Sequence, residues 1–336
     1  MQKEEKLLKK EILKAKNILV LSHKGPDLDA FCSMLIVQRV LNDIFPYKNI
    51  VVKARQYPNI KLPHMKKIQI VEDGEKIEPG DEDLIIVTDA TEWGLCLENV
   101  DTIENTSAPV FFIDHHKSDI IPSPNTYTIN EMRSSATEQV YVTFKKLFGN
   151  RFEIDEDIAA LVQYGILSDT GRFLFDLTTP ETHRIFAEVM EIHRVDVEEF
   201  EYKSRKFPRE ANDVIIEYLK TLTITGDMSY MYISEEIIKE RGFTKQAVNE
   251  AFNYLKDRYL RFIQGVHWGF IVKPMFDDNK WSVSFRSTKG YQDVEGIAQK
   301  LNGGGHKYAS ATKISANNVQ KVLDTVLEII EKETSL

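Results

Sequence analysis

The sequence predicts an α/β protein in which a mostly parallel sheet flanked by helices is followed by a smaller α/β domain. Two observations lead to this fold class. Short apolar runs typical of buried strands alternate with helical patterns in the first part of the chain, as in βαβ units. A strongly charged stretch, DVEEFEYKSRKFPR, then precedes a second series of strand and helix patterns. The length of 336 residues fits about two domains of ordinary size.

The N-terminal elements follow from hydrophobic periodicity. A lysine-rich helix with leucine and isoleucine on one side comes first, and short apolar runs then alternate with longer helical patterns. Thr179 and Pro180 suit the cap and the first turn of the last helix in this part. The expected strands are 18–21, 50–53, 84–88 and 110–113. The expected helices are 3–16, 30–41, 135–148, 155–169 and one that begins at 180.

The second part repeats the mixture of strands and helices after the charged stretch. The expected strands are 222–225, 230–233, 268–274 and 281–286. The expected helices are 210–220, 245–258, 294–301 and 317–333. We therefore expect a first domain at 1–195, a linker at 196–215 and a second domain at 216–336.

The charge of the chain restricts its partners. The 43 basic and 52 acidic residues give a net charge of −9, and the whole acidic excess lies before Ala211. Long duplex nucleic acid held by a diffuse basic surface is therefore excluded, because such binding needs surplus lysine and arginine. Phosphate chemistry stays open, because bound metal ions can supply positive charge.

The sequence favours a cytoplasmic protein without a membrane partner. No apolar stretch approaches the about 20 residues that cross a bilayer, and the N-terminal residues are charged throughout, unlike a secretory signal. Cys32 and Cys96 have neither disulfide-framework nor zinc-site spacing, so we expect two reduced thiols.

Carboxylates and imidazoles follow the predicted strands at the edge where parallel sheets carry active sites. Each has a plain structural alternative when taken alone, because an aspartate after a strand often caps a helix or forms a turn. Three adjacent ionisable residues after the apolar run VFFI are harder to explain by packing. The residues are His23, Asp27 and Asp29 in HKGPDLD, Asp89 in VTDA, Asp114, His115 and His116 in DHH, and Asp169 in SDTG.

Together these side chains predict a metal centre. So many carboxylates in one place repel one another unless cations neutralise them. A pair of divalent ions bridged by an aspartate is the simplest solution, and such a pair activates water and holds the oxygens of a phosphoryl group. Mixed Asp and His ligands suit Mn²⁺, with Mg²⁺ as the alternative.

The C-terminal part carries a separate signal in NGGGHKYASA. Gly303, Gly304 and Gly305 could cradle an anion with their backbone N–H groups, or they could end the preceding helix. The adjacent His306 favours the phosphate interpretation. Arg286, in SFRS, could be a surface charge or a contact to a phosphate or base.

These motifs resemble those of the DHH/DHHA1 phosphoesterase superfamily over nearly the whole chain. HKGPDLD, VTDA, DHH and SDTG match the DHH part, and SFRS with NGGGHKYASA matches the DHHA1 signature. Their order is most similar to the NrnA-type oligoribonucleases, or nanoRNases, some of which also dephosphorylate pAp. One departure is Leu28 and Cys32 in PDLDAFCS, where many such members have glycine. Neither position supplies a metal ligand in that family.

The resemblance implies a role for each site residue. His23 and Asp27 would bind one ion, Asp89 would bridge both ions, and Asp29, His115 and Asp169 would bind the other. Asp114 would orient His115, and His116 would face the scissile phosphate. The second domain would close over a cleft that holds the active site. The implied substrate-binding residues are Arg286, Gly303, Gly304, Gly305 and His306, together with Ser135 and Thr137 of RSSATE.

The implied function is Mn²⁺-dependent hydrolysis of very short single-stranded RNA to mononucleotides, with removal of the 3′-phosphate of pAp as a second activity. The alternative is hydrolysis of a small phosphate compound, such as a cyclic dinucleotide, pyrophosphate or polyphosphate. A non-catalytic protein on the same fold is disfavoured, because all six ligand positions hold Asp or His. A homodimer is compatible with the sequence.

Overall fold

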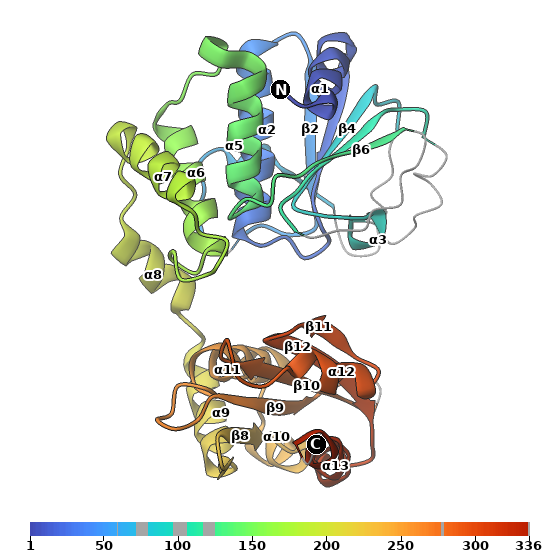
Figure 1. Ribbon diagram of the computed structural model, residues 1–336, viewed down its shortest axis with the longest axis vertical. Coiled ribbons are helices and arrows are strands. Elements are labelled where there is room, and N and C mark those ends of the chain that lie inside the picture. The colour runs from blue at the N-terminus through green and yellow to red at the C-terminus, as the bar shows by residue number, and fades with distance from the viewer. Residues whose placement is uncertain (59, 72–79, 97–105, 117–124, 277–278, 335–336) are drawn as a thin grey trace. The chain divides into compact units, whose positions relative to one another are not determined.

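The computed structural model divides into two compact units, Met1–Arg205 and Lys206–Leu336. It describes residues 1–336 except 59, 72–79, 97–105, 117–124, 277–278 and 335–336 (Figure 1). The predicted linker, 196–215, contains helix α8 (Val197–Arg205) and the first part of α9 (Arg209–Lys220). A charged stretch can be helical here because Phe200 is buried against the first unit, beside Tyr164.

The first unit is built on a six-stranded parallel sheet of order β3-β2-β1-β4-β5-β6. The predicted fold class is confirmed, and the prediction missed only the short β3 and the polar β6 among these strands. The strands are β1 (Asn17–Leu21), β2 (Asn49–Ala54), β3 (Gln69–Ile70), β4 (Leu84–Thr88), β5 (Val110–Ile113) and β6 (Thr126–Ile129).

Most helices of this unit cover one face of the sheet, where they form its main apolar core (Figure 1). A smaller cluster on the other face includes Trp93 and Cys96 of the short helix α3 (Trp93–Cys96). Both cysteines are buried free thiols. The longer helices are α1 (Lys3–Lys14), α2 (Leu28–Ile44), α5 (Ala136–Phe148), α6 (Glu156–Asp169) and α7 (Pro180–Ile192), with 3₁₀ turns η1 (Met65–Lys67) and η2 (Gly149–Arg151).

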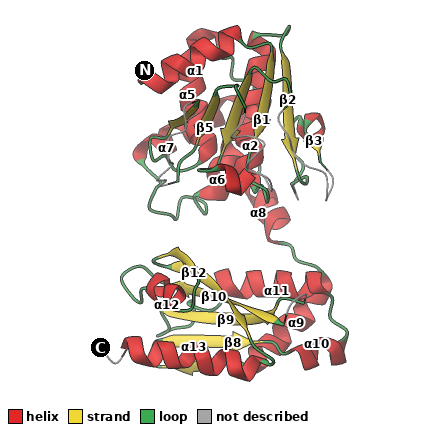
Figure 2. Cartoon of the chain, turned by 90° about the vertical axis from the view of Figure 1, so that its right-hand side faces the viewer, coloured by secondary structure: helices red, strands yellow, loops and turns green. Residues whose placement is uncertain are grey.

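The second unit holds a mixed sheet of order β11-β12-β10-β9-β8-β7, in which only the β8–β9 pair is parallel. In Figure 2, strands β8 and β9 run between helix α11 (Lys245–Arg258) and helix α13 (Val319–Thr334). One apolar core lies under α12 and α13, and another lies under α9, α10 and α11. The strands are β7 (Thr223–Thr225), β8 (Met228–Tyr232), β9 (Trp268–Pro274), β10 (Lys280–Ser287), β11 (Gly304–His306) and β12 (Ala309–Ser315). The remaining helices are α10 (Glu235–Arg241), α11 (Lys245–Arg258), α12 (Val294–Lys300) and α13 (Val319–Thr334).

Candidate metal centre

The strand order of the first unit determines where its polar side chains meet. The order reverses between β1 and β4, because β2 and β3 follow on one side and β5 and β6 on the other. Such a reversal in a parallel sheet opens a crevice beyond the carboxyl ends of the strands. His23 lies just beyond β1, Asp89 directly follows β4, and Asp114 directly follows β5. The sheet therefore gathers side chains that are up to about ninety residues apart in sequence.

One group of possible ligands contains His23, Asp27 and Asp89, whose donor atoms lie within 4.8 Å of one another. His23 Nε2 is 3.5 Å from Asp89 Oδ2. Asp27 also caps α2, because its Oδ1 accepts a 3.0 Å hydrogen bond from the Ala30 N–H. The cap and the ligand interpretations of Asp27 are therefore compatible, since a carboxylate has two oxygens.

A second group contains Asp29, His115 and Asp169, again within 4.8 Å. His115 Nε2 is 3.3 Å from Asp169 Oδ2, at the last residue of α6. Asp29 is fully buried and accepts hydrogen bonds of 2.7 and 3.0 Å from the N–H groups of Ala136 and Thr137. These N–H groups form the N-terminus of α5, which favours a negative charge.

Asp89 lies between the two groups and presents one oxygen to each. Its Oδ2 faces His23 at 3.5 Å, and its Oδ1 is 3.7 Å from His115 Nε2. The backbone of Asp89 has φ +55°, a left-handed conformation that aspartate tolerates better than most residues. This geometry is the one that a bridging carboxylate requires.

Asp114 contacts His116 rather than His115, so the predicted pairing was wrong. Asp114 Oδ1 is 3.0 Å from His116 Nδ1, and its Oδ2 accepts a 3.2 Å hydrogen bond from the His116 N–H. His115 instead directs its Nδ1 to the carbonyl oxygen of Arg133 at 3.2 Å. The sharp turn after β5 brings the aspartate back onto the residue two positions later, which adjacency in the sequence does not reveal.

The carboxylates of the centre are close enough to repel one another, and burial together with this repulsion raises the pKa values of Asp29 and Asp169. Burial and the repulsion of Asp89 and Asp169 raise the pKa of Asp29 well above its usual range. Burial and the repulsion of Asp89 and Asp27 raise the pKa of Asp169 to about 7. Burial lowers the pKa of His115, whereas the hydrogen bond that His116 donates to Asp114 raises the pKa of His116 to about 9.

The residues present fit divalent metal ions. Asp89 Oδ1 and His115 Nε2 are buried 3.7 Å apart, and neither has a hydrogen-bond partner among the described residues. Leaving such atoms unsatisfied costs about 1–3 kcal/mol each, a penalty that a bound cation would remove. Carboxylate oxygens with imidazole nitrogens are a ligand set suited to Mn²⁺ and, with more water, to Mg²⁺.

Ser135 and Thr137 do not line an exposed surface, which corrects their predicted role in substrate binding. Both residues are fully buried. Ser135 caps α5 by accepting a 3.0 Å hydrogen bond from the Glu138 N–H, and Thr137 donates its hydroxyl to the carbonyl oxygen of Asp29 at 3.2 Å. The RSSATE segment therefore supports the metal centre from within the unit.

The sequence analysis also missed Arg133 and Glu138, which flank this segment and form an ion pair at 3.1 Å. Glu138 is 1% exposed and Arg133 is largely buried. A signal was present, because Ser135 followed three residues later by Glu138 has the spacing of a capping box. Here Glu138 turns to Arg133 and Thr182 instead of closing the box.

In the second unit, Arg286 of β10 and His306 of β11 lie on the two strands that flank β12. Both are paired with Ala309 of β12, so their side chains share a face of the sheet. Arg286 is partly exposed and its Nε is 2.9 Å from Asp257 Oδ1, while His306 is exposed. The structure thus brings together these two predicted substrate-binding residues within the second unit.

The three glycines of NGGGH occupy different structural environments. A Cβ on Gly303 would lie 2.2 Å from the Ala311 carbonyl oxygen, and one on Gly305 would lie 2.6 Å from that of Ala309. Both glycines thus allow β11 to approach β12 closely. A Cβ on Gly304 would face open space, although Gly304 is paired with Ala311 in the same ladder. The helix-end interpretation also holds in part, since α12 ends just before, and the left-handed residue there is Asn302.

Known proteins share both units. The profile of the DHH family N-terminal domain matches residues 17–166, and the DHHA1 domain profile matches residues 227–332. The chain is 28% identical over 301 residues to the bifunctional oligoribonuclease and PAP phosphatase NrnA of Bacillus subtilis (strain 168), a match that covers 88% of this chain and 89% of the relative.

Two further similarities concern other phosphate-related proteins. The chain is 27% identical over 194 residues to a probable manganese-dependent inorganic pyrophosphatase of Streptococcus equi subsp. equi (strain 4047), covering 54% of this chain and 58% of the relative. The structure of an exopolyphosphatase-related protein from Bacteroides fragilis has a TM-score of 0.79 at 18% identity, and the match covers 99% of this chain and 95% of that one. This structural similarity supports the two-unit α/β fold described above.

Within the described part of the chain, no helix combines the length and the apolar character needed to cross a bilayer. The paired groups of Asp and His and the two matched domains point to the same conclusion. The chain belongs to the DHH family of phosphoesterases and carries a DHHA1 domain after its DHH domain.

Proposed function

We propose that this protein hydrolyses very short RNA oligonucleotides to mononucleotides, and that it also removes the 3′-phosphate of pAp. The observation that carries the proposal is the pair of adjacent ligand groups, one of which contains Asp89, whose Oδ1 also lies 3.7 Å from His115 of the other. The relative from Bacillus subtilis, whose match spans most of both chains, supports the choice of substrate. Both cysteines are free thiols, which suits action in the reducing cytoplasm.

We infer that two divalent ions, Mn²⁺ or alternatively Mg²⁺, occupy the centre. His23 and Asp27 would bind one ion, and Asp89 would contact both. Asp29, His115 and Asp169 would bind the other ion. When bound, such ions neutralise phosphate charge and make water a stronger nucleophile near neutral pH.

His116 is the group of this chain that we expect to contact the scissile phosphate. Its side chain is 50% exposed, unlike the buried His115, so a substrate can reach it. The hydrogen bond that His116 donates to the Asp114 carboxylate raises the pKa of His116 to about 9, which favours the protonated ring at neutral pH. A fixed cation next to a phosphoryl group stabilises the negative charge that develops during hydrolysis.

We propose that the second unit binds the nucleotide. The guanidinium of the partly exposed Arg286 can donate two hydrogen bonds to one phosphate, and no side chain at Gly304 obstructs the approach of a ligand. The exposed His306 shares a sheet face with Arg286. A second domain with these groups would distinguish a nucleotide from inorganic pyrophosphate.

The deciding experiment is a substrate panel with Mn²⁺. We expect labelled RNAs of two to five nucleotides to yield mononucleotides, pAp to release phosphate, and a long duplex to stay intact. An absence of mononucleotide release from every short RNA would contradict the proposal.

Pyrophosphate is the second candidate substrate, because the manganese-dependent pyrophosphatase relative matches 54% of this chain. The same panel includes pyrophosphate and cyclic dinucleotides at equal concentration. Turnover of pyrophosphate far above that of dinucleotide RNA would favour this candidate. An Arg286→Met variant adds a second criterion, since it should weaken nucleotide turnover more than pyrophosphate turnover.

A further inference from the structure

One segment of the first unit holds two members of the same ligand group. The carbonyl oxygen of Arg133 accepts from His115 Nδ1 at 3.2 Å, which directs Nε2 of that ring toward Asp169. The N–H groups of Ala136 and Thr137 bind both carboxylate oxygens of Asp29. The position of residues 133–137 therefore sets the positions of Asp29 and His115 together.

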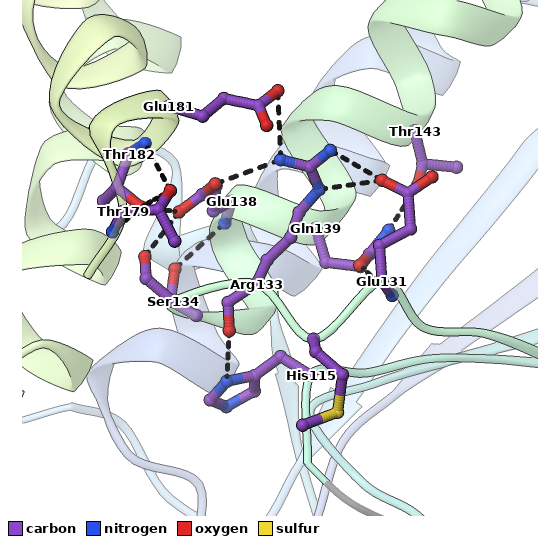
Figure 3. A network of polar contacts seen from close by, with 12 residues as sticks. His115, Glu131, Arg133, Ser134, Glu138, Gln139, Thr143, Thr179, Glu181 and Thr182 are labelled. Atoms are coloured by element: carbon purple, nitrogen blue, oxygen red, sulfur yellow. Dashed lines mark hydrogen bonds and ion pairs between the residues drawn. The ribbon is translucent and has the colours of Figure 1, made fainter. Parts of the chain in front are cut away.

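This segment is anchored by an ion-pair network with a buried centre at Arg133 and Glu138, which Figure 3 shows next to His115. Arg133 is 10% exposed and contacts three carboxylates. Its Nη2 is 2.6 Å from Glu131, and its Nη1 is 3.1 Å from Glu138 and 3.3 Å from Glu181. Burial opposes the charge of Arg133, but these carboxylates raise its pKa above the usual value.

Glu138 is the centre of the network. Its carboxylate accepts hydrogen bonds from the guanidinium of Arg133 at 3.1 Å, from the hydroxyl of Ser134, and from the hydroxyl of Thr182 at 2.8 Å. Thr182 belongs to α7, so Glu138 ties the segment before α5 to a second helix.

A packing role alone does not account for this arrangement. Apolar side chains of similar volume would fill the same space with equal or greater stability, because burying charges costs free energy. Charged hydrogen bonds, in contrast, fix the orientation of the groups that they join. The orientation of a metal ligand is set by the groups that contact it.

We propose that Arg133 and Glu138 are positioning residues of the metal centre, which hold Asp29 and His115 in the geometry that binds one of its two ions. The inference rests on the two-ion centre of the proposed function, but it does not depend on which phosphate compound is the substrate. The ion bound by His23 and Asp27 has no contact with this segment among the interactions described, so the effect should be selective.

The test is a titration of the full-length, metal-free protein with Mn²⁺, followed by electron paramagnetic resonance, which reports free Mn²⁺. The variants are Glu138→Gln and Arg133→Met. We expect each to weaken one of two bound ions about 10–100-fold and to leave the other near its wild-type affinity, as for other partners of metal ligands. A raised Mn²⁺ concentration should restore turnover.

The matched control is Glu5→Gln, which alters another fully buried carboxylate of the same unit. Glu5 pairs with Lys146 at 3.3 Å, and Lys146 has a separate 2.6 Å contact to Glu131 that does not involve Glu5. The melting temperature should fall, while both Mn²⁺ affinities stay unchanged. If Glu138→Gln fails to fold, Ser134→Ala removes one donor to Glu138 and should weaken the same ion by a smaller factor.

The outcomes separate the two proposals. If the wild type binds two ions and the folded variants bind both with wild-type affinity, the positioning role is refuted and the proposed function stands. Equal weakening of both ions would refute it as well, because it indicates a general structural loss. A wild type that binds fewer than two ions would overturn the two-ion centre and this inference with it.

Discussion

The candidate site residues of the two units differ in their exposure to solvent. In the first unit Asp29, Asp89, Asp114 and His115 are at most 5% exposed. In the second unit Arg286 is partly exposed and His306 is exposed. Metal ligands must be held within a fraction of an ångström, which requires buried supports, whereas groups that meet a diffusing ligand must stay accessible to it.

The two units also differ in the charge of their polar side chains. The acidic excess of the chain lies before Ala211, and buried carboxylates in the first unit have raised pKa values. In the second unit burial lowers the pKa of Lys256, and the nearby Arg286 adds to that shift. The first unit is thus prepared for cations, and the second has cationic groups that an anion would stabilise.

The largest expected effect is at Asp89. Asparagine keeps the shape and tolerates the left-handed backbone, but it removes the charge that faces His23 of one ligand group and His115 of the other. Asp89→Asn should lower kcat/KM by about 10³-fold or more, because several kcal/mol of charge stabilisation depend on the bound ions. Asp43→Asn, at an exposed carboxylate paired with Arg39, is the control and should keep full activity. Substantial activity of the Asp89→Asn variant would contradict the view that the first unit acts through a buried, charged metal centre.

The next effect concerns the pairing of Asp114 with His116. Asp114→Asn should lower kcat by about 10–100-fold, because the imidazolium loses the carboxylate that orients it. Mn²⁺ affinity should stay near the wild-type value, since His115 is held by the Arg133 carbonyl. A loss of Mn²⁺ affinity equal to the loss of kcat would mean that Asp114 acts on His115 instead.

In the second unit the expected effect is smaller and falls on binding. Arg286→Met should raise KM for a dinucleotide about 10-fold with little change in Mn²⁺ affinity, the scale of one charge-assisted hydrogen bond. The control is Lys313→Met, because Lys313 is an exposed cation on the same face of the sheet and pairs with Ser282 further along β10. Equal effects of the two variants would indicate a diffuse charge effect and no specific contact.

The smallest effect is on the stability of the metal-free protein. The pKa of Asp169 is about 7 in the folded protein and about 3.9 in an unfolded chain, so the folded state binds this proton more tightly. The resulting stabilisation is complete at low pH and is lost as the pH rises through about 7.

With a chelator present, the melting temperature should therefore be lower at pH 8.5 than at pH 6, by about 2–4 °C for each kcal/mol lost. Asp169→Asn should reduce this difference, because asparagine resembles the protonated acid at every pH. A metal-free protein whose melting temperature rises over this range would contradict the raised pKa.

Much of the fold could be predicted, because apolar periodicity reports which face of an element is buried. The strands 84–88, 110–113 and 268–274 and the helix 245–258 occur with the predicted bounds. The prediction missed β3, β6, β11 and β12, which are short or carry polar and small residues. Their strand conformation depends on hydrogen bonds to a neighbour, which no local pattern contains.

The sequence by itself determined the residue types of the site and their place at strand ends, because a run such as VFFI followed by DHH leaves few structural alternatives. Only the tertiary structure decided which atoms face one another. It paired Asp114 with His116, buried Ser135 and Thr137, and connected Glu138 to Thr182. These contacts depend on how a turn closes and how α5 meets α7, which long-range packing sets and residue spacing does not encode.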